Sequence, residues 1–327
     1  MISIVYDLQD ERGIEAALVN LRNDLQAVTG TEVRLVSSVE EIKGSVIVAG
    51  SVSSPLIKKL VASSKIQLNG LTGKHEKFEI QVVDQPFSGV DKALVIAGSD
   101  RRGAIYGIYE LSEQSGVSPW YFWADVPVRR SSVLYVKPGV YTAGEPAVRY
   151  RGIFLNDEAP ALSGWAHHTF GGFNNRFYEK VFELILRLKG NFLWPAMWGN
   201  AFFDDDPNNG ELADRMGIVI STSHHEPMGR AHAEWNRYGK GKWDYSTNAA
   251  VLDEFWKGGM ERMKEYETVV TLAMRGDGDE PMSEENNFAL LEKIVKNQRS
   301  IIRKVSGKKI TEIPQVWALY KEVQGVS

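Results

Sequence analysis

Five apolar runs beyond residue 150 each end in polar, charged or aromatic residues. The runs are RGIFLNDE (151–158), NFLWPAMW (191–198), GIVISTSHHEP (217–227), VVTLAMRGDGDE (269–280) and IPQVWALYKE (313–322). Helical stretches separate them, and alternating strands and helices favour a parallel sheet. In a (β/α)8 barrel the chemistry lies at the carboxyl ends of the strands. The pattern therefore predicts an enzyme whose active site is spread over five strand ends.

The first 140 residues predict a separate, small α/β domain. Helical spacing over residues 11–28 ends at Gly30, a suitable C-cap, and Ser99 or Asp100 is suited to cap a helix that follows. The turn at Gly98 does not match the dinucleotide-binding fingerprint. We predict an N-terminal α/β domain over 1–140, a linker over 141–149 and a partial (β/α)8 catalytic barrel over 150–327. Strands are expected at 2–6, 33–36, 45–50, 77–83 and 92–98.

Composition excludes several classes of protein. The chain has 327 residues, no cysteine and a net charge of −4. It therefore has no thiol nucleophile and no basic surface for nucleic acid. It contains no run of the roughly 20 apolar residues that a membrane-spanning helix needs, and it begins without the features of a signal peptide. We expect no nucleic-acid partner and no membrane partner.

Two clusters follow the first two runs. Asn156, Asp157 and Glu158 are three consecutive polar residues that cannot all be buried without partners. They either anchor a loop or contact substrate, and one of the carboxylates is a catalytic candidate. After the second run, Trp194 is expected in the core, whereas Trp198 lies further along and is a candidate wall for a ligand.

His224, His225 and Glu226 end the third run. Neighbouring side chains on an extended backbone point in opposite directions, so we expect at most one of the two histidines to face a substrate. A structural histidine is the alternative reading. A metal-dependent hydrolase that uses His224, Glu226 and Asp279 is another, although neither H-x-x-x-H nor H-E-x-x-H occurs.

RGDGDE ends the fourth run with Arg275, Asp277 and Asp279 among two glycines. Glycine lets a backbone turn tightly and approach a ligand closely. Arg275 either pairs with its neighbouring carboxylates for structural reasons or binds a substrate carboxylate in bidentate fashion. Lys321 and Glu322 end the fifth run. Lys–Glu is a common dipeptide on protein surfaces, and its position after a predicted strand is what makes it a candidate here.

Several carboxylates, aromatic walls and no serine or cysteine nucleophile motif suit glycoside hydrolysis. In that reaction one carboxylic acid protonates the leaving oxygen, and another carboxylate activates water or attacks carbon. The two groups need different environments so that one stays protonated near neutral pH.

These residues resemble family 115 glycoside hydrolases, the xylan α-1,2-glucuronidases. The resemblance covers nearly the whole chain and is most specific at 150–158, 182–198, 222–228, 275–280 and 316–324. It implies an inverting release of glucuronic acid, or its 4-O-methyl ether, from glucuronoxylan. It also implies a small α/β domain ahead of a (β/α)8 barrel.

The resemblance implies roles for particular residues. It pairs Glu322 with Asp279 or Asp157 as acid and base, and it makes Arg275 the residue that binds the uronate carboxylate. Asn156, Trp198 and a histidine of the HHE cluster, His224 by preference, also belong to the active site that it implies. We add His225, Glu226 and Asp277 as substrate-binding candidates from the same clusters, and we expect neither a metal nor a cofactor.

The sequence departs from the family pattern by stopping after about five of the eight barrel strands. We therefore expect residues 1–327 alone to be inactive or nearly so. The resemblance places any dimer contacts in regions outside this sequence, and it implies a secreted or periplasmic location. A non-catalytic carbohydrate-binding protein on a degenerate barrel is the alternative from another functional class.

Overall fold

The computed structural model describes residues 1–156, 159–282 and 288–318. These residues form two compact units. The first holds 1–151, 183–191 and 215–217, and the second holds 152–182, 192–214 and 218–327. The structure confirms the predicted fold class, a small α/β domain and a (β/α)-type arrangement of parallel strands. The domain boundaries drawn from the sequence stay a prediction.

A six-stranded sheet with the order β2-β1-β3-β5-β4-β6 is the centre of the first unit. The four strands β2, β1, β3 and β5 are parallel, and β4 runs antiparallel to both of its neighbours. Tyr141, which was predicted to begin the linker, pairs with β4 as part of an edge strand. The strands are β1 (Ile2–Val5), β2 (Val33–Val36), β3 (Ser45–Ser51), β4 (Phe78–Phe87), β5 (Val90–Gly98) and β6 (Val140–Tyr141).

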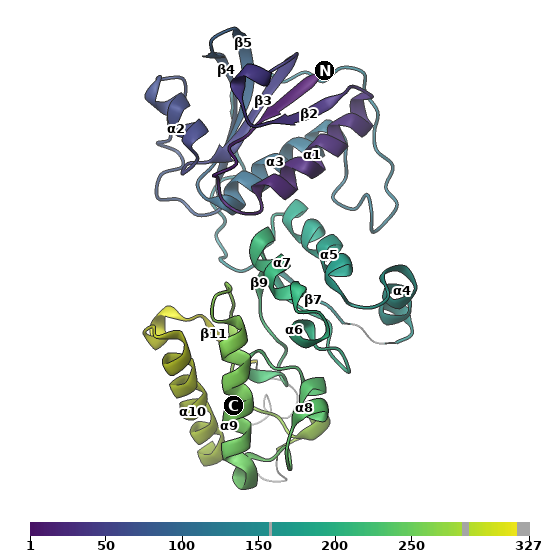
Figure 1. Cartoon of the computed structure of the whole chain (residues 1–327), viewed down its shortest axis with the longest axis vertical. Coiled ribbons are helices and arrows are strands. Elements are labelled where there is room, and N and C mark those ends of the chain that lie inside the picture. Colours follow the sequence, from purple (N-terminus) through teal and green to yellow (C-terminus); the bar gives the residue numbers. More distant parts are fainter. Residues whose placement is uncertain (157–158, 283–287, 319–327) are drawn as a thin grey trace. The chain divides into compact units, whose positions relative to one another are not determined.

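Helices cover both faces of this sheet. The first, α1 (Ile14–Thr29), lies beside α3 (Arg101–Ser115) on one face, and α2 (Pro55–Ala62) covers the other (Figure 1). The predicted caps are confirmed. Gly30 ends α1 with φ of +66°, and the Asp100 carboxylate accepts a hydrogen bond from the Gly103 amide at 2.8 Å to begin α3.

An ionic cluster is buried in the first unit around Glu76, which is 7% exposed. Its carboxylate lies 2.6 Å from Arg102 Nε and 2.6 Å from Arg151 Nη2. Asn191 Nδ2 donates to the same carboxylate at 2.8 Å. Arg151 and Asn191 each come directly before a strand of the second unit, β7 and β8 respectively. One carboxylate therefore fixes the chain at two points where strands begin.

The described residues of the second unit form five short parallel strands in chain order. Strand β7 pairs with β8, and β8 pairs with β9. A parallel bridge between Ile220 and Thr268 continues the series towards β10, which pairs with β11. This is the order of neighbouring strands in a (β/α)8 barrel. The strands are β7 (Gly152–Phe154), β8 (Phe192–Trp194), β9 (Val219–Ile220), β10 (Val270–Thr271) and β11 (Gln315–Val316).

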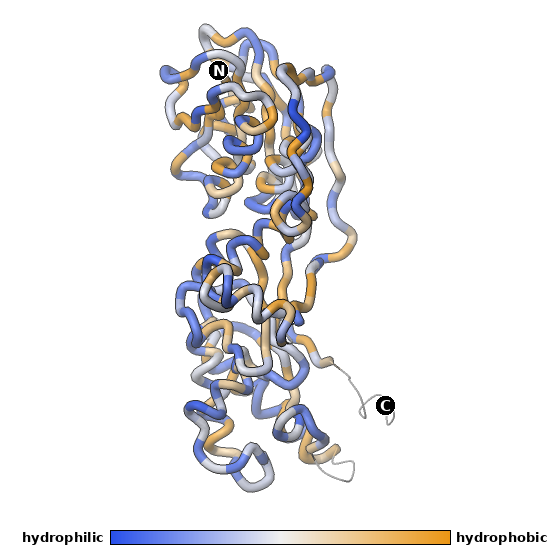
Figure 2. Tube along the Cα trace, turned by 90° about the vertical axis from the view of Figure 1, so that its right-hand side faces the viewer, coloured by the Kyte–Doolittle hydropathy of each residue, from blue (hydrophilic) through white to orange (hydrophobic). Residues whose placement is uncertain are grey.

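Helices separate these strands, as the sequence predicts. Figure 2 shows short hydrophobic and hydrophilic stretches alternating along the trace of the chain, as expected for elements that bury one face. None of the described helices is long and apolar enough to cross a membrane. The helices are α4 (Ala161–Phe170), α5 (Asn175–Arg187), α6 (Phe202–Asp205), α7 (Asn208–Met216), α8 (His232–Tyr238), α9 (Tyr245–Met263) and α10 (Phe288–Ser306).

Asp206 stabilises the beginnings of two helices in the second unit. Its carboxylate accepts hydrogen bonds from the amides of Asn175 at 2.9 Å and Asn208 at 3.0 Å. Partial burial acts to raise the pKa of Asp206, but these hydrogen bonds outweigh it and hold the pKa below its ordinary value of 3.8. We expect Asp206→Ala to lower the free energy of unfolding by about 1–2 kcal/mol at pH 7, because two helix ends lose their acceptor.

The effect of this substitution depends on pH. Because the pKa is lowered in the folded state, the stabilisation is fully present above the unfolded pKa and is lost as the pH falls through the folded value. Urea unfolding at pH 7 and near pH 3 should therefore show a difference between wild type and variant that shrinks at the lower pH. Glu211→Ala, at an exposed carboxylate on α7, is the control. An equal effect of the two substitutions at pH 7 would refute the capping role.

Candidate active site

Most of the described site candidates lie in the loops that follow β8, β9 and β10, and Asn156 follows β7. Trp198 comes after β8, His224 and His225 come after β9, and Arg275 and Asp279 come after β10. The same loops hold non-glycine residues in the left-handed backbone region, which is uncommon and concentrates at functional sites. They are Trp198 (φ +52°), Met228 (+62°), Ala273 (+80°) and Asp279 (+68°).

Asp279 is a buried carboxylate of this site, at 4% exposed. The Arg275 Nε atom donates a hydrogen bond to Asp279 Oδ1, and Arg275 Nη2 donates to the Asp279 carbonyl at 2.8 Å. His224 Nε2 lies 3.2 Å from the same Oδ1 atom. A carboxylate this deeply buried needs such partners to remain ionised. The structure thus brings His224, from the third run, beside Arg275 and Asp279, which both end the fourth run.

The two glycines of the RGDGDE loop have distinct roles. A Cβ atom at Gly276 would meet the Pro281 carbonyl oxygen at 2.4 Å, so the close approach of two backbone segments requires glycine there. Gly278 has φ of +63°, a conformation that favours glycine. The predicted tight turn is confirmed, and it returns the backbone so that Asp279 lies beside Arg275.

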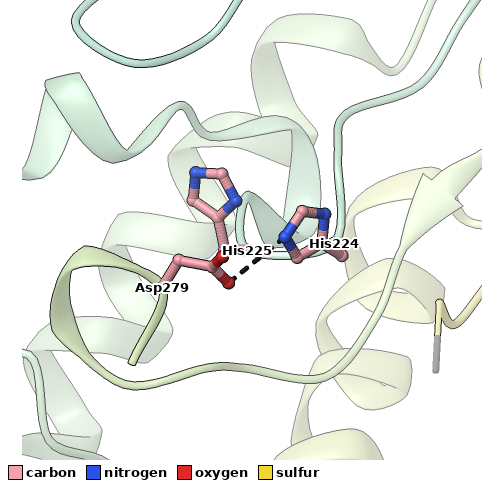
Figure 3. Close-up of side chains that lie close together, drawn as sticks. All are labelled: His224, His225 and Asp279. Atoms are coloured by element: carbon pink, nitrogen blue, oxygen red, sulfur yellow. Dashed lines mark ion pairs between the residues drawn. The ribbon is translucent and has the colours of Figure 1, made fainter. Parts of the chain in front are cut away.

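The two neighbouring histidines lie side by side. Their ring centroids are 4.8 Å apart, and Figure 3 shows both rings beside the Asp279 carboxylate. The expectation that they point in opposite directions was wrong. It assumed an extended backbone, whereas residues 224–225 form a turn in the loop that follows β9. A turn brings successive side chains to the same side, which strand geometry does not allow.

His225 is buried beneath an aromatic side chain. It is 2% exposed, and the Trp198 ring lies over it with centroids 4.8 Å apart and planes inclined by 31°. Burial, together with the neighbouring His224, lowers the pKa of His225 to about 4. The imidazole is therefore neutral at pH 7. Trp198 itself is 48% exposed, as expected for a ligand wall.

Three residues that the sequence did not single out hold the loop after β10 in place. Gln298 on α10 donates to the Ala273 carbonyl and accepts from its amide, both at 2.8 Å. Trp243 Nε1 donates to the Arg275 carbonyl at 2.9 Å, and His232 Nε2 lies 2.8 Å from Asp277 Oδ1. None of the three follows a strand, and no sequence signal identified them.

The remaining predicted residues have different positions. Glu226 Oε1 accepts from the His232 amide at 3.3 Å. Of the described residues, those that could hold a metal ion are His224, His225 and Asp279, so His225 takes the place predicted for Glu226. Asp277 is largely exposed, and Asn156 is exposed beyond β7. Asp157, Glu158, Lys321 and Glu322 lie outside the described residues.

Comparison with known families and sequences gives one clear similarity. The model described as glycosyl hydrolase family 115 matches residues 143–327, which is more than half of the chain. No curated protein matches the sequence.

Solved structures give a second and independent similarity. The chain is 32% identical, with a TM-score of 0.88, to a family GH115 4-O-methyl-α-glucuronidase with specificity for decorated arabinogalactans. That match covers 99% of this chain and 42% of the other, so the chain spans less than half the length of that enzyme.

Two more distant structures share the fold alone. A GH138 enzyme targeting pectin rhamnogalacturonan II is 15% identical with a TM-score of 0.53, over 94% of this chain and 34% of the other. A mutant Streptomyces plicatus β-hexosaminidase in complex with its product GlcNAc is 11% identical with a TM-score of 0.55, over 92% of this chain and 60% of the other.

Proposed function

The chain belongs to glycosyl hydrolase family 115, and on that premise we propose that its protein releases glucuronic acid or 4-O-methylglucuronic acid from a branched polysaccharide. The observation that carries the proposal is the 32% identity to a 4-O-methyl-α-glucuronidase over 99% of this chain. The geometry supports it, since Asp279 is a buried carboxylate beside an arginine and an imidazole. Such a site combines a catalytic carboxylate with groups that attract an anionic sugar.

We propose specific roles for the site residues. Asp279 acts as one of the two catalytic carboxylates, with Glu322 or Asp157 as the other. Arg275, whose Nε and Nη2 atoms donate to Asp279, binds the uronate carboxylate through further N–H donors of the same guanidinium. An inverting reaction needs room for water between two carboxyl groups roughly 6.5–9.5 Å apart. Proton NMR of the first product released tests this, because inversion of an α-linkage yields the β-anomer.

We propose glucuronoxylan, with α-1,2-linked branches, as the substrate. Decorated arabinogalactan is the second candidate, because the similar enzyme has specificity for that class. Both polymers carry the uronosyl group that the site would bind, and they differ in the backbone sugar next to the scissile bond. We propose that the protein acts outside the cytoplasm, where such polymers lie.

The test is uronic acid release from both polymers by the protein expressed from its complete coding sequence, compared with residues 1–327 alone. Release from glucuronoxylan supports the proposal, and release from arabinogalactan alone selects the second candidate. Binding of uronosyl oligosaccharides without any release would instead favour a non-catalytic carbohydrate-binding protein. Full turnover by residues 1–327 would refute the expectation that this segment alone is inactive.

Trp198 should contribute to substrate binding rather than to the chemical step. We expect Trp198→Ala to raise KM about tenfold with a smaller change in kcat, because covering about half of a large aromatic side chain is worth about 1–2 kcal/mol. Trp120→Ala is a matched control, since that indole is 45% exposed and lies in the first unit. An unchanged KM in Trp198→Ala would remove this residue from the site.

A further inference from the structure

His224, His225 and Asp279 place two imidazoles and one carboxylate around a common point. One ligand atom from each residue lies within 4.8 Å of the others. Two histidines and a carboxylate form one of the donor sets by which proteins hold a catalytic zinc ion, with a further position left for water. The three side chains come from the loops after two neighbouring strands, and Figure 3 shows them facing one another.

His225, one of the three residues, also contains a buried polar atom without a described partner. The Nε2 atom of His225 is buried, and no hydrogen-bond partner for it lies within the part of the chain that the structure describes. Its other nitrogen, Nδ1, lies 3.4 Å from Ser223 Oγ. A buried polar atom without a partner costs about 1–3 kcal/mol, and native structures contain few of them.

The surroundings of the cluster resemble the outer shell of a metal site. Carboxylates that bind metals are themselves hydrogen-bonded, and such partners fix their orientation. Arg275 does this for Asp279, and Trp243 in turn binds the Arg275 carbonyl. The guanidinium charge also repels a cation, so the affinity should be below that of a purely structural zinc site. Two nitrogen donors select transition metals over Mg²⁺ and Ca²⁺, which prefer oxygen.

We propose that His224, His225 and Asp279 bind one divalent transition-metal ion of the Zn²⁺ or Co²⁺ type. The sequence alone did not predict this, because it placed the two histidines on opposite sides of a strand. The consequence for catalysis rests on the proposed function. If Asp279 is a catalytic carboxylate, a bound ion occupies it and competes with the uronosyl substrate, so the ion acts as an inhibitor.

The test is a titration of the full chain with Co²⁺, followed by its visible d–d absorption, with Mg²⁺ as the negative control. We expect one Co²⁺ per cluster, displaced by Zn²⁺. His225→Gln and Asp279→Asn should each weaken binding at least about tenfold, since each loses a ligand. The matched control is the double variant His167→Ala/His168→Ala, which removes an adjacent but exposed pair of histidines on α4. It should bind Co²⁺ as the wild type does.

Zinc-edge anomalous scattering from crystals soaked in Zn²⁺ locates the ion without relying on any variant. Density about 2.0–2.2 Å from the two imidazole nitrogens and the carboxylate oxygen supports the proposal. Density elsewhere, no Co²⁺ absorption, or binding that persists in His225→Gln overturns it. Loss of uronic acid release with Zn²⁺ and its recovery with a chelator tests the inhibitory consequence separately. If the protein did not release uronic acid, Co²⁺ absorption and Zn²⁺ anomalous scattering would still show whether the ion binds.

Discussion

Asp279→Asn is expected to lower kcat for uronic acid release by about 10²–10⁴-fold, the range for loss of a positioned acid or base. Asparagine keeps the size of the side chain and an oxygen that accepts from Arg275, but it cannot exchange a proton. KM should change much less, because the residue acts on the reacting bond. Initial rates on glucuronoxylan, measured over a range of substrate concentrations, separate the two parameters.

A matched control exists in the same loop. Glu280 is an exposed carboxylate next to Asp279, and Glu280→Gln should leave both kinetic parameters near the wild-type values. Circular dichroism shows whether Asp279→Asn remains folded, which matters because the wild-type carboxylate is 4% exposed and paired. If that variant unfolds, Asp279→Glu keeps the charge and moves it by one methylene, and it should be folded but slow. A folded Asp279 variant with wild-type kcat would exclude this residue from the chemistry.

Glu76→Gln is expected to lower the free energy of unfolding of the first unit by about 3 kcal/mol. Removing one partner of a buried ion pair costs about 3–5 kcal/mol because a charge is left uncompensated. We expect the lower end of this energy range because the side chains of Arg102 and Arg151 are 15% and 23% exposed. Water therefore partly screens their charges. Urea unfolding followed by circular dichroism measures the difference, with the two units allowed separate transitions.

The control for this prediction is an ion pair at the surface. Asp84 and Lys92 pair on the same sheet with side chains that are 75% and 67% exposed. Asp84→Asn should leave the unfolding midpoint almost unchanged, because exposed pairs contribute little. If Glu76→Gln and Asp84→Asn changed the unfolding midpoint equally, burial would not explain the contribution of Glu76 to stability.

Local patterns predicted the elements well. Gly30 ends one helix and Asp100 begins another, as their residue types predicted. Such predictions succeed because caps depend on a few neighbouring backbone groups. The apolar runs became the strands of a parallel arrangement, because burial on both faces requires such runs. Residues at the ends of the second, third and fourth runs came together for the same reason, since parallel strands share a carboxyl edge.

Contacts between distant segments were not predicted. The turn at residues 224–225 depends on how the chain leaves β9, and a pattern of apolar residues does not specify it. Gln298 and Trp243 hold the loop after β10 from helices and loops that are 25 and 32 residues away from their partners. Their residue types are ordinary, and only their positions in space give them a role.

By itself, the sequence determined the α/β class, the strand and helix order, the family resemblance and the set of carboxylates that could do chemistry. These follow from short-range periodicity and from residue types that are rarely placed together by chance. Only the tertiary structure decided that His224 and His225 both lie beside Asp279, that Arg275 holds this carboxylate, and that Glu76 anchors Arg151 and Asn191. Those contacts depend on the packing of segments far apart in the chain, and hydrophobic patterning fixes which faces are buried without fixing which side chains meet.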